Sequence, residues 1–230
     1  MRVAAADLGA TSGRVVLADW ADGTPVLTEV TRFRHAPVED ANGWRWDIDV
    51  LRRGVVDGVT KAAAQGAVSV GIDAWGVDYG VWRDGDWVGP VRCYRDPRNL
   101  DGMAIVESRM PWTQLYALTG IQRLPLNTIY QIAVDAPERW ADGSVLVPLP
   151  DVLAHHLTGE LGAELTHAST TALLDPRTRT WSAPVLDMLG LSSRAVLPLQ
   201  EPGAVRGSTR EGLPLVVVAG HDTASAFAGT

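Results

Sequence analysis

The first 46 residues alternate short apolar runs with polar turns, a pattern that predicts β-strands. Two apolar runs cover residues 3–6 and 15–19, and the polar, glycine-bearing segment between them predicts a hairpin turn. A third run covers residues 26–33 and a fourth covers residues 44–46. The sequence therefore predicts a meander of strands at the start of the chain.

Helical spacing follows this meander. Asp47 is the expected N-cap of a helix, because Ile48 begins a series of apolar residues at helical spacing and Gly66 stands where such a helix would end. The same reasoning predicts further helices within residues 99–118 and 127–140, over 151–157 with an end at Gly159, and from 224 onward.

Three more apolar runs predict strands between these helices, at residues 68–72, 145–147 and 215–219, the last of them fully buried. Strands interleaved with helices in this way predict an α/β domain with a mixed sheet. Residues 175–182 and 201–212 are rich in turn-forming and charged residues and predict surface loops inside that domain.

Composition narrows the class of protein. The chain of 230 residues is 46% hydrophobic, and its net charge of −7 comes without a run of like charges. These features exclude the basic surface of a nucleic-acid or anionic-membrane binder and favour a small-molecule substrate. The sequence has no signal-peptide or membrane-span pattern, and Cys93 is its only cysteine, so we expect a cytoplasmic protein without an internal disulfide.

Lysine usage excludes two classes of enzyme. Lys61 is the only lysine, and Thr60 rather than a glycine precedes it. A P-loop requires a Gly-Lys pair, and a Schiff-base enzyme requires a reactive lysine, so both are poor interpretations of this chain. Any phosphate contact is therefore expected from arginine or from backbone amides.

Three polar clusters share one position along the chain. Asp7, Asp73 and Asp222 each come directly after one of the predicted strands. Open α/β sheets bind their ligands at the carboxyl ends of the strands. The three carboxylates are therefore expected to converge on one cleft.

The first cluster has the residues of an anion-binding turn. The segment after Asp7 contains two glycines with Thr11 and Ser12, small residues that let amides and hydroxyls approach an anion closely. Arg14 adds a guanidinium group suited to phosphate. An ordinary hairpin turn is the competing interpretation, and the turn alone leaves both open.

The third cluster places Asp222 between a predicted strand and a predicted helix. This position suits a catalytic carboxylate and equally a helix cap, so the residue alone leaves both roles open. His221 fits a ligand contact or a core histidine bonded to a backbone carbonyl, and a single histidine makes no metal site.

Taken together, the motifs resemble the FGGY family of carbohydrate kinases, and within it the kinases that act on L-rhamnulose. The resemblance runs along the whole chain, and the ordered motifs that carry it are DLGATSGR at 7–14, GIDAWGVDY at 71–79, YRDPR at 94–98, TGIQ at 119–122, LNTIYQ at 126–131, LTGE at 157–160, ASTT at 168–171 and GHDTAS at 220–225.

The resemblance implies a fold and a division of the chain. Members of the family have two actin-like (ribonuclease H-like) lobes that close over their substrates. By this resemblance residues 1–219 form the N-terminal domain, an α/β first lobe with a mixed sheet and flanking helices. Residues 220–230 then begin the hinge or second lobe, the remainder of which we expect to be absent from this chain.

The resemblance also implies a reaction, the ATP-dependent phosphorylation of L-rhamnulose to L-rhamnulose 1-phosphate with Mg²⁺. Asp222 corresponds to the general base, and Asp7 lies near the metal. The implied phosphate contacts are Ala10, Thr11, Ser12, Gly13 and Arg14, and the implied sugar contacts are Gly76, His221 and Thr223, with Trp75, Asp78 and Arg95 as further candidates.

Three alternatives stay open at this point. The substrate could be another ketose, such as L-fuculose or xylulose, because L-rhamnulose and related ketoses differ by stereochemistry at single carbons. The chain could be a sugar-binding fragment without turnover. It could also be half of an enzyme that is completed by a second lobe, in cis or in trans. In each case the expected partners are a sugar and ATP, with neither nucleic acid nor membrane.

Overall fold

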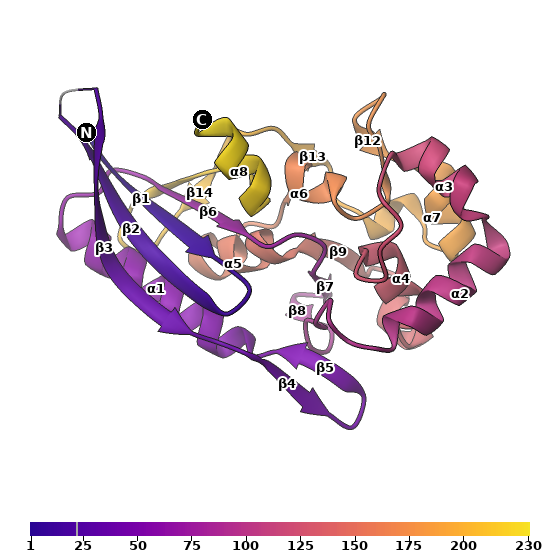
Figure 1. Cartoon of the computed structure of the whole chain (residues 1–230). Helices are drawn as coiled ribbons and strands as arrows, with labels where there is room; N and C mark the ends of the chain where they lie inside the picture. Colours follow the sequence, from indigo (N-terminus) through magenta and orange to yellow (C-terminus); the bar gives the residue numbers. More distant parts are fainter. Residues whose placement is uncertain (22) are drawn as a thin grey trace.

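The structure, a computed structural model, describes residues 1–21 and 23–230 and has a six-stranded sheet at one end (Figure 1). Strand β6 is parallel to its neighbours β1 and β15, and the other neighbours pair antiparallel, so the predicted mixed sheet is confirmed. In spatial order the strands are β14 (Val205–Ser208), β15 (Pro214–Val216), β6 (Val70–Ala74), β1 (Arg2–Leu8), β2 (Ser12–Trp20) and β3 (Pro25–Arg34).

Helix α1 (Ile48–Ala64) packs its apolar stripe on one face of this sheet. The Asp47 carboxylate accepts a hydrogen bond from the Val50 amide at 3.2 Å, which confirms the predicted N-cap. Gly58 lets the helix approach β2, because a Cβ atom there would lie 2.3 Å from Val15 Cγ2. Helix α5 (Leu149–Thr158) contacts α1 and β6 and ends at Gly159, as predicted.

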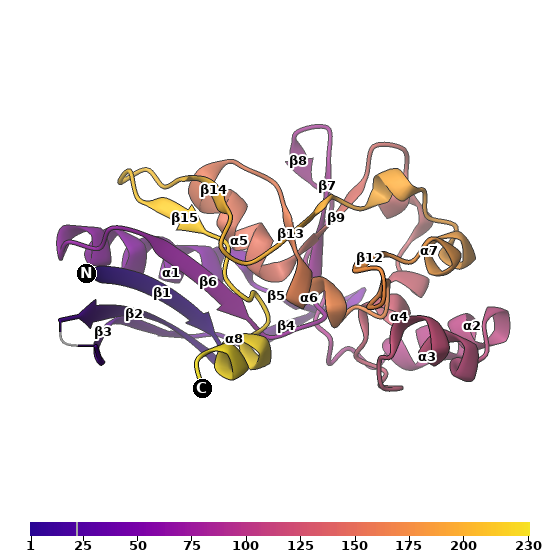
Figure 2. The same ribbon diagram turned by 90° about the horizontal axis from the view of Figure 1, so that it is seen from above.

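Helix α8 (Asp222–Ala228) lies on the opposite side of the sheet from α1 (Figure 2). Alternation along β6 explains this arrangement, since Val70, Ile72 and Ala74 point into the core while Asp73 points toward α8. The carboxylate-bearing face of β6 is thus the face that α8 partly covers.

The other end of the molecule has its own hydrophobic core, formed mostly by helices (Figure 1). Val106, Ile129 and Leu146 are fully buried in it. Its elements are α2 (Asn99–Arg109), α3 (Trp112–Thr119), α4 (Thr128–Ala133), η1 (Pro137–Trp140), α7 (Ala183–Leu189), η2 (Ser193–Ala195) and the three-stranded sheet of β8 (Asp86–Trp87), β7 (Tyr79–Arg83) and β9 (Val145–Pro148).

Short elements connect the two cores. Helix α6 (Leu165–Ser169) has β10 (Ala163–Glu164) directly before it and lies between the two ends in both views (Figures 1 and 2). The remaining short strands are β13 (Leu199–Gln200), which pairs with β10, and the hairpin of β11 (Leu174–Asp175) and β12 (Thr180–Trp181).

Three sequence predictions were wrong in detail. Residues 44–46 do not continue the meander of the six-stranded sheet. They belong to β5 (Gly43–Trp46), which pairs with β4 (Pro37–Asp40) on one side. On its other side, Trp44 and Trp46 exchange backbone hydrogen bonds with residues 91–93. The run 215–219 is not a fully buried strand, since β15 stops at Val216 and burial alternates along the run. The prediction of loops at 175–182 and 201–212 was wrong in part, because the first contains β12 and the second contains the edge strand β14.

Across residues 1–21 and 23–230, the helices fall short of the length and apolarity that crossing a membrane requires.

Candidate sugar and phosphate site

The three predicted carboxylates do converge. Asp7 and Asp73 are register partners on the adjacent parallel strands β1 and β6, and Ala74 forms a parallel bridge with His221, the residue before Asp222. Burial, together with the nearby carboxylates of Asp7 and Asp222, raises the pKa of Asp73 to about 7. This group of acids lies at the carboxyl end of the parallel strands, where α/β sheets bind ligands.

The turn after Asp7 is held in shape from two sides. The Gly9 amide donates to the Ser12 carbonyl at 3.0 Å, and the His35 ring lies with Nε2 2.9 Å from the Gly9 carbonyl. Arg14 places Nε and Nη2 at 2.8 and 2.7 Å from Asp7 Oδ2. The predicted phosphate ligand and the predicted metal ligand therefore pair with each other. Ala10 and Thr11 lie in the accessible turn between β1 and β2, whereas Ser12 and Gly13 begin β2 and the predicted phosphate contact Gly13 is buried.

A cavity of about 390 Å³ includes His221, the residue before Asp222, in its lining. Gly76 lies close to two other lining residues, because a Cβ atom there would lie 3.1 Å from Thr170 and 3.2 Å from His221 Cδ2. The lining is mainly apolar with a few polar groups, which is typical of small-molecule sites, and it consists of Trp75, Gly76, Val77, Tyr94, Ile121, Gln122, Leu124, Leu126, Asn127, Thr170 and His221.

Val77 in the cavity wall has a strained backbone. Its φ is +72°, and the Asp78 amide donates to the Gly76 carbonyl at 3.0 Å, so Val77 is the centre of a γ-turn. A β-branched residue rarely adopts positive φ, and such strain clusters at functional sites. The Gln131 side-chain amide donates to the Val77 carbonyl at 3.3 Å, and the Thr128 hydroxyl also donates to it.

Asp78 lies beneath the cavity and has no exposed surface. Its Oδ2 accepts from the indoles of Trp46 and Trp75 at 2.6 and 2.8 Å, and its Oδ1 accepts from Gln131 at 3.1 Å. Burial outweighs these three donors and raises the pKa of Asp78 to about 7. In this structure the Asp78 carboxylate therefore orients Trp75 instead of facing the cavity itself.

Two other predicted sugar contacts, Arg95 and Thr223, are not among the residues that line this cavity. Arg95 is exposed, donates to the Tyr94 hydroxyl at 2.9 Å and lies 5.2 Å from the centre of the Tyr94 ring, a cation–π contact. Thr223 is exposed, and its amide donates to Asp222 Oδ1 at 2.6 Å. His221 Nε2 lies 3.3 Å from the same oxygen. His221 is the N-cap residue of α8, so Asp222 is not its cap.

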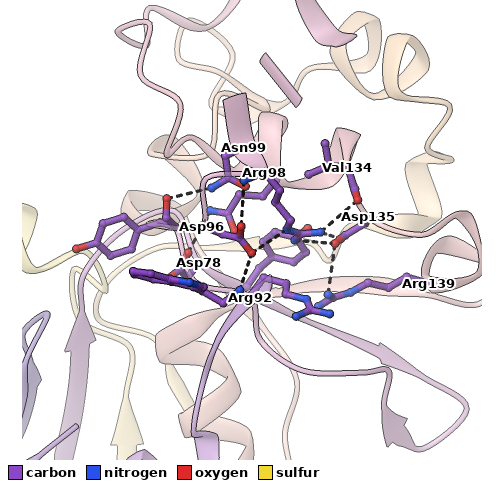
Figure 3. A network of polar contacts seen from close by, with 12 residues as sticks. Asp78, Arg92, Asp96, Arg98, Asn99, Val134, Asp135 and Arg139 are labelled. Carbon is purple, nitrogen blue, oxygen red and sulfur yellow. Dashed lines mark hydrogen bonds and ion pairs between the residues drawn. The ribbon is translucent and has the colours of Figure 1, made fainter. Parts of the chain in front are cut away.

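A buried ionic network supports the Tyr94 side of the cavity (Figure 3). Arg98 lies between Asp96 and Asp135, at 3.3 and 3.2 Å, and both carboxylates are 2% exposed. Asp96 also accepts from the Trp44 amide at 2.7 Å. Removing either buried partner would leave an uncompensated charge, so the network fixes the segment 94–98 relative to α4.

The acids suit a metal–phosphate group in number and chemistry. Magnesium in phosphate sites usually takes one or two carboxylates, with phosphate and water supplying the rest. Asp7 and Asp73 are such a pair. The raised pKa of Asp73 comes first from burial and then from repulsion by Asp7 and Asp222, and a cation would relieve that repulsion. Among the described residues, no group of three or more histidine, cysteine or acidic side chains forms a complete site by itself.

Sequence reasoning gave several of these residues no role. Asp73 was one of the predicted strand-end acids without an assigned function, and Gln131 and Thr170 lay inside quoted motifs. His35 and Trp46 gave no local signal, because their partners, the Gly9 carbonyl and the Asp78 carboxylate, are 26 and 32 residues away. The spacing of polar residues along the sequence does not reveal a hydrogen bond between residues that lie so far apart in the chain.

Comparison with known proteins adds independent findings. A family model described as the FGGY family of carbohydrate kinases, N-terminal domain, matches residues 3–229. The rhamnulokinase of Pectobacterium atrosepticum is 39% identical over 239 residues, covering 99% of this chain and 48% of the relative. The rhamnulokinase of Mannheimia succiniciproducens is 37% identical, covering 98% of this chain and 48% of the relative. The chain thus spans about half the length of these relatives.

Solved structures agree on the fold. A xylulose kinase from Lactobacillus acidophilus superposes with a TM-score of 0.83 at 17% identity, covering 96% of this chain and 48% of that one. A carbohydrate kinase from Novosphingobium aromaticivorans gives 0.82 at 26% identity, covering 98% and 50%. The predicted fold, the actin-like first lobe of a two-lobed sugar kinase, is confirmed.

Proposed function

Because this chain belongs to the FGGY family of carbohydrate kinases, we propose that it binds the ketose in a reaction that transfers the γ-phosphoryl group of ATP to the C1 hydroxyl of L-rhamnulose. The observation that carries this proposal is the cavity lined by Gly76 and His221, because the His221 ring in its lining lies 3.3 Å from the Asp222 carboxylate. A reaction of this kind belongs in the cytoplasm, where ATP is available.

We assign Asp222 as the general base. Its Oδ1 is occupied by the Thr223 amide and the His221 ring, and its side chain is 39% exposed, so Oδ2 can face the C1 hydroxyl and take its proton. Phosphoryl transfer through a loose transition state removes that proton late, so a carboxylate of ordinary basicity suffices. His221 and the Gly76 backbone orient the sugar so that C1 points toward Asp222.

Residues 10–14 are the proposed phosphate cradle. Ala10 and Thr11 lie in the turn before β2, where their amides would meet phosphate oxygens, and Arg14 would exchange its partner Asp7 for the incoming anion. When bound, Mg²⁺ supplies neutralisation of the phosphate charge, with Asp7 and Asp73 as the carboxylates that would hold it. We assign the remaining ATP contacts to a second lobe, because the chain spans about half the length of its rhamnulokinase relatives.

Substitution of Asp222 by asparagine tests the proposal. Asp222→Asn is made in the complete gene product, beside Asp187→Asn, which changes an exposed aspartate on α7. We expect kcat with L-rhamnulose to fall by about 10²- to 10⁴-fold in Asp222→Asn and to stay unchanged in the control, because an amide cannot accept the proton. The melting temperature should stay the same, since the asparagine side-chain oxygen can still accept from the Thr223 amide.

More than about a tenth of the wild-type kcat in Asp222→Asn would remove this residue from the role of general base. Sugar titration of the 230-residue chain, run in parallel, separates binding from turnover. Binding without turnover would identify this chain as the sugar-binding half alone, and wild-type turnover with L-fuculose or xylulose but not L-rhamnulose would replace the proposed substrate.

A further inference from the structure

Thr166 on α6 and Thr170, the C-cap residue of α6, contact two walls of the sugar cavity. They are four residues apart and the backbone of Thr170 is still helical, which places their side chains on the same face. One cavity wall is the turn at Gly76 and Val77, and the other is at His221, which Gly220 precedes. Helix α6 runs between these two turns.

Thr166 holds the His221 wall. Its hydroxyl donates to Glu164 Oε2 at 2.7 Å and accepts from the His221 amide at 3.3 Å. The same carboxylate oxygen accepts from the Gly220 amide at 2.9 Å. Glu164 is 2% exposed, so water does not compete for these bonds. The backbone before Asp222 is therefore attached to α6 at two successive amides.

Thr170 holds the Val77 wall in the same manner. Its hydroxyl donates to the His167 carbonyl at 2.8 Å and accepts from the Val77 amide at 3.0 Å. Val77 is the residue with a φ of +72°, a conformation that persists only where the surroundings impose it. The Thr170 hydroxyl is thus one of the groups that impose the γ-turn.

The number of hydrogens on each hydroxyl group fixes which partner donates in the bonds from the two threonines to the cavity walls. A hydroxyl has one hydrogen, and in each threonine that hydrogen is donated elsewhere, so the oxygen toward the cavity wall acts as an acceptor. The walls themselves are close, since a Cβ atom on Gly76 would lie 3.1 Å from Thr170 and 3.2 Å from His221. A small movement of either wall would change the width of the cavity.

We propose that Thr166 and Thr170 are positioning residues that set the spacing between the two walls and thereby the affinity for the ketose. The inference rests on the proposed function for the identity of the ligand. The contacts themselves do not depend on that identity, so the two can be tested separately.

The first test uses Thr166→Val and Thr170→Val in the complete gene product. Valine keeps the shape of threonine and removes the acceptor. We expect each variant to raise the KM for L-rhamnulose by about 5- to 10-fold, as for the loss of one hydrogen bond, and serine at either position to restore most of it. Thr158→Val is the matched control, because the Thr158 hydroxyl donates to the Ala154 carbonyl at 2.9 Å and accepts from the Glu160 amide at 3.1 Å, away from the cavity.

A KM within twofold of wild type in both valine variants would overturn the proposal. The same rise in Thr158→Val would overturn it too, because the effect would then follow from any lost threonine hydroxyl. A loss of stability common to all three variants would lower all three melting temperatures, so it cannot account for a KM that rises in Thr166→Val and Thr170→Val but not in Thr158→Val.

The second test needs no activity. Amide hydrogen exchange of the 230-residue chain should become faster at residues 220–222 in Thr166→Val and at residues 76–78 in Thr170→Val, each at its own wall. Unchanged exchange at both walls would overturn the positioning role. If the wild-type enzyme phosphorylates none of the ketoses while exchange responds as expected, the proposed function fails and the positioning role stands.

Discussion

Replacement of Asp78 by asparagine should make the protein less sensitive to rising pH. Asp78 is fully buried beneath the sugar cavity, and burial raises its pKa to about 7 despite donors from Trp46, Trp75 and Gln131. The folded state therefore favours the neutral acid. Asparagine is neutral at every pH, and its carbonyl oxygen can still accept from both indoles. The asparagine amide group would lie next to the Gln131 side chain, and any loss of stability from that contact would be the same at each pH.

The magnitude follows from the two pKa values. The ordinary pKa of the group is 3.8 and the folded one is about 7, and each pH unit between them changes the free energy of unfolding by about 1.4 kcal/mol. Asp78 therefore contributes its full stability below pH 3.8 and loses about 4 kcal/mol as the pH rises to 7. About 2.5 kcal/mol of that loss lies between pH 5 and pH 8.

The assay is urea unfolding of the 230-residue chain, followed by tryptophan fluorescence at pH 5 and pH 8. The stability of Asp78→Asn minus that of wild type should increase by about 2.5 kcal/mol from pH 5 to pH 8, because all other groups cancel in the difference. Asp187→Asn should show no such trend. If the difference stays flat or decreases, the three N–H donors outweigh burial, Asp78 is an anion in the folded state, and our account of the cavity floor is wrong.

Three further substitutions test other parts of the structure. Gly76→Ala should raise the KM for the ketose about tenfold, because the added methyl carbon would lie 3.1 Å from Thr170 and 3.2 Å from His221, a few tenths of an ångström too close; an unchanged KM in steady-state kinetics would contradict this packing. Arg206→Met leaves Asp151 buried without its partner and should lower the free energy of unfolding by about 3–5 kcal/mol in urea, with recovery when Asp151→Asn is added. Arg14→Ala should weaken ATP binding by about 1.5–3 kcal/mol while sugar affinity changes little; equal loss of both in calorimetry would show that Arg14 serves the fold.

Local signals predicted most of the elements. Alternation of apolar and polar residues identified β1, β2 and β3, and the cap at Asp47 and the glycine at Gly159 fixed one end of α1 and of α5. These features depend on residues a few positions apart, where the chain has few alternative conformations. The wrong assignment of 44–46 to the meander has the opposite cause, since β5 bonds to residues 91–93, which no local pattern indicates.

The sequence by itself also determined which residue types stand at the strand ends, and so which acids could meet. Only the tertiary structure decided what each of them faces. It paired Arg14 with Asp7, turned Asp78 away from the cavity and under Trp75, and attached Val77 to Thr170 across 93 residues. Burial and long-range closure of the chain set these contacts, and both depend on how the two cores pack on α6. A linear pattern carries the chemistry of a side chain, but its partner and its exposure to water are properties of the folded chain.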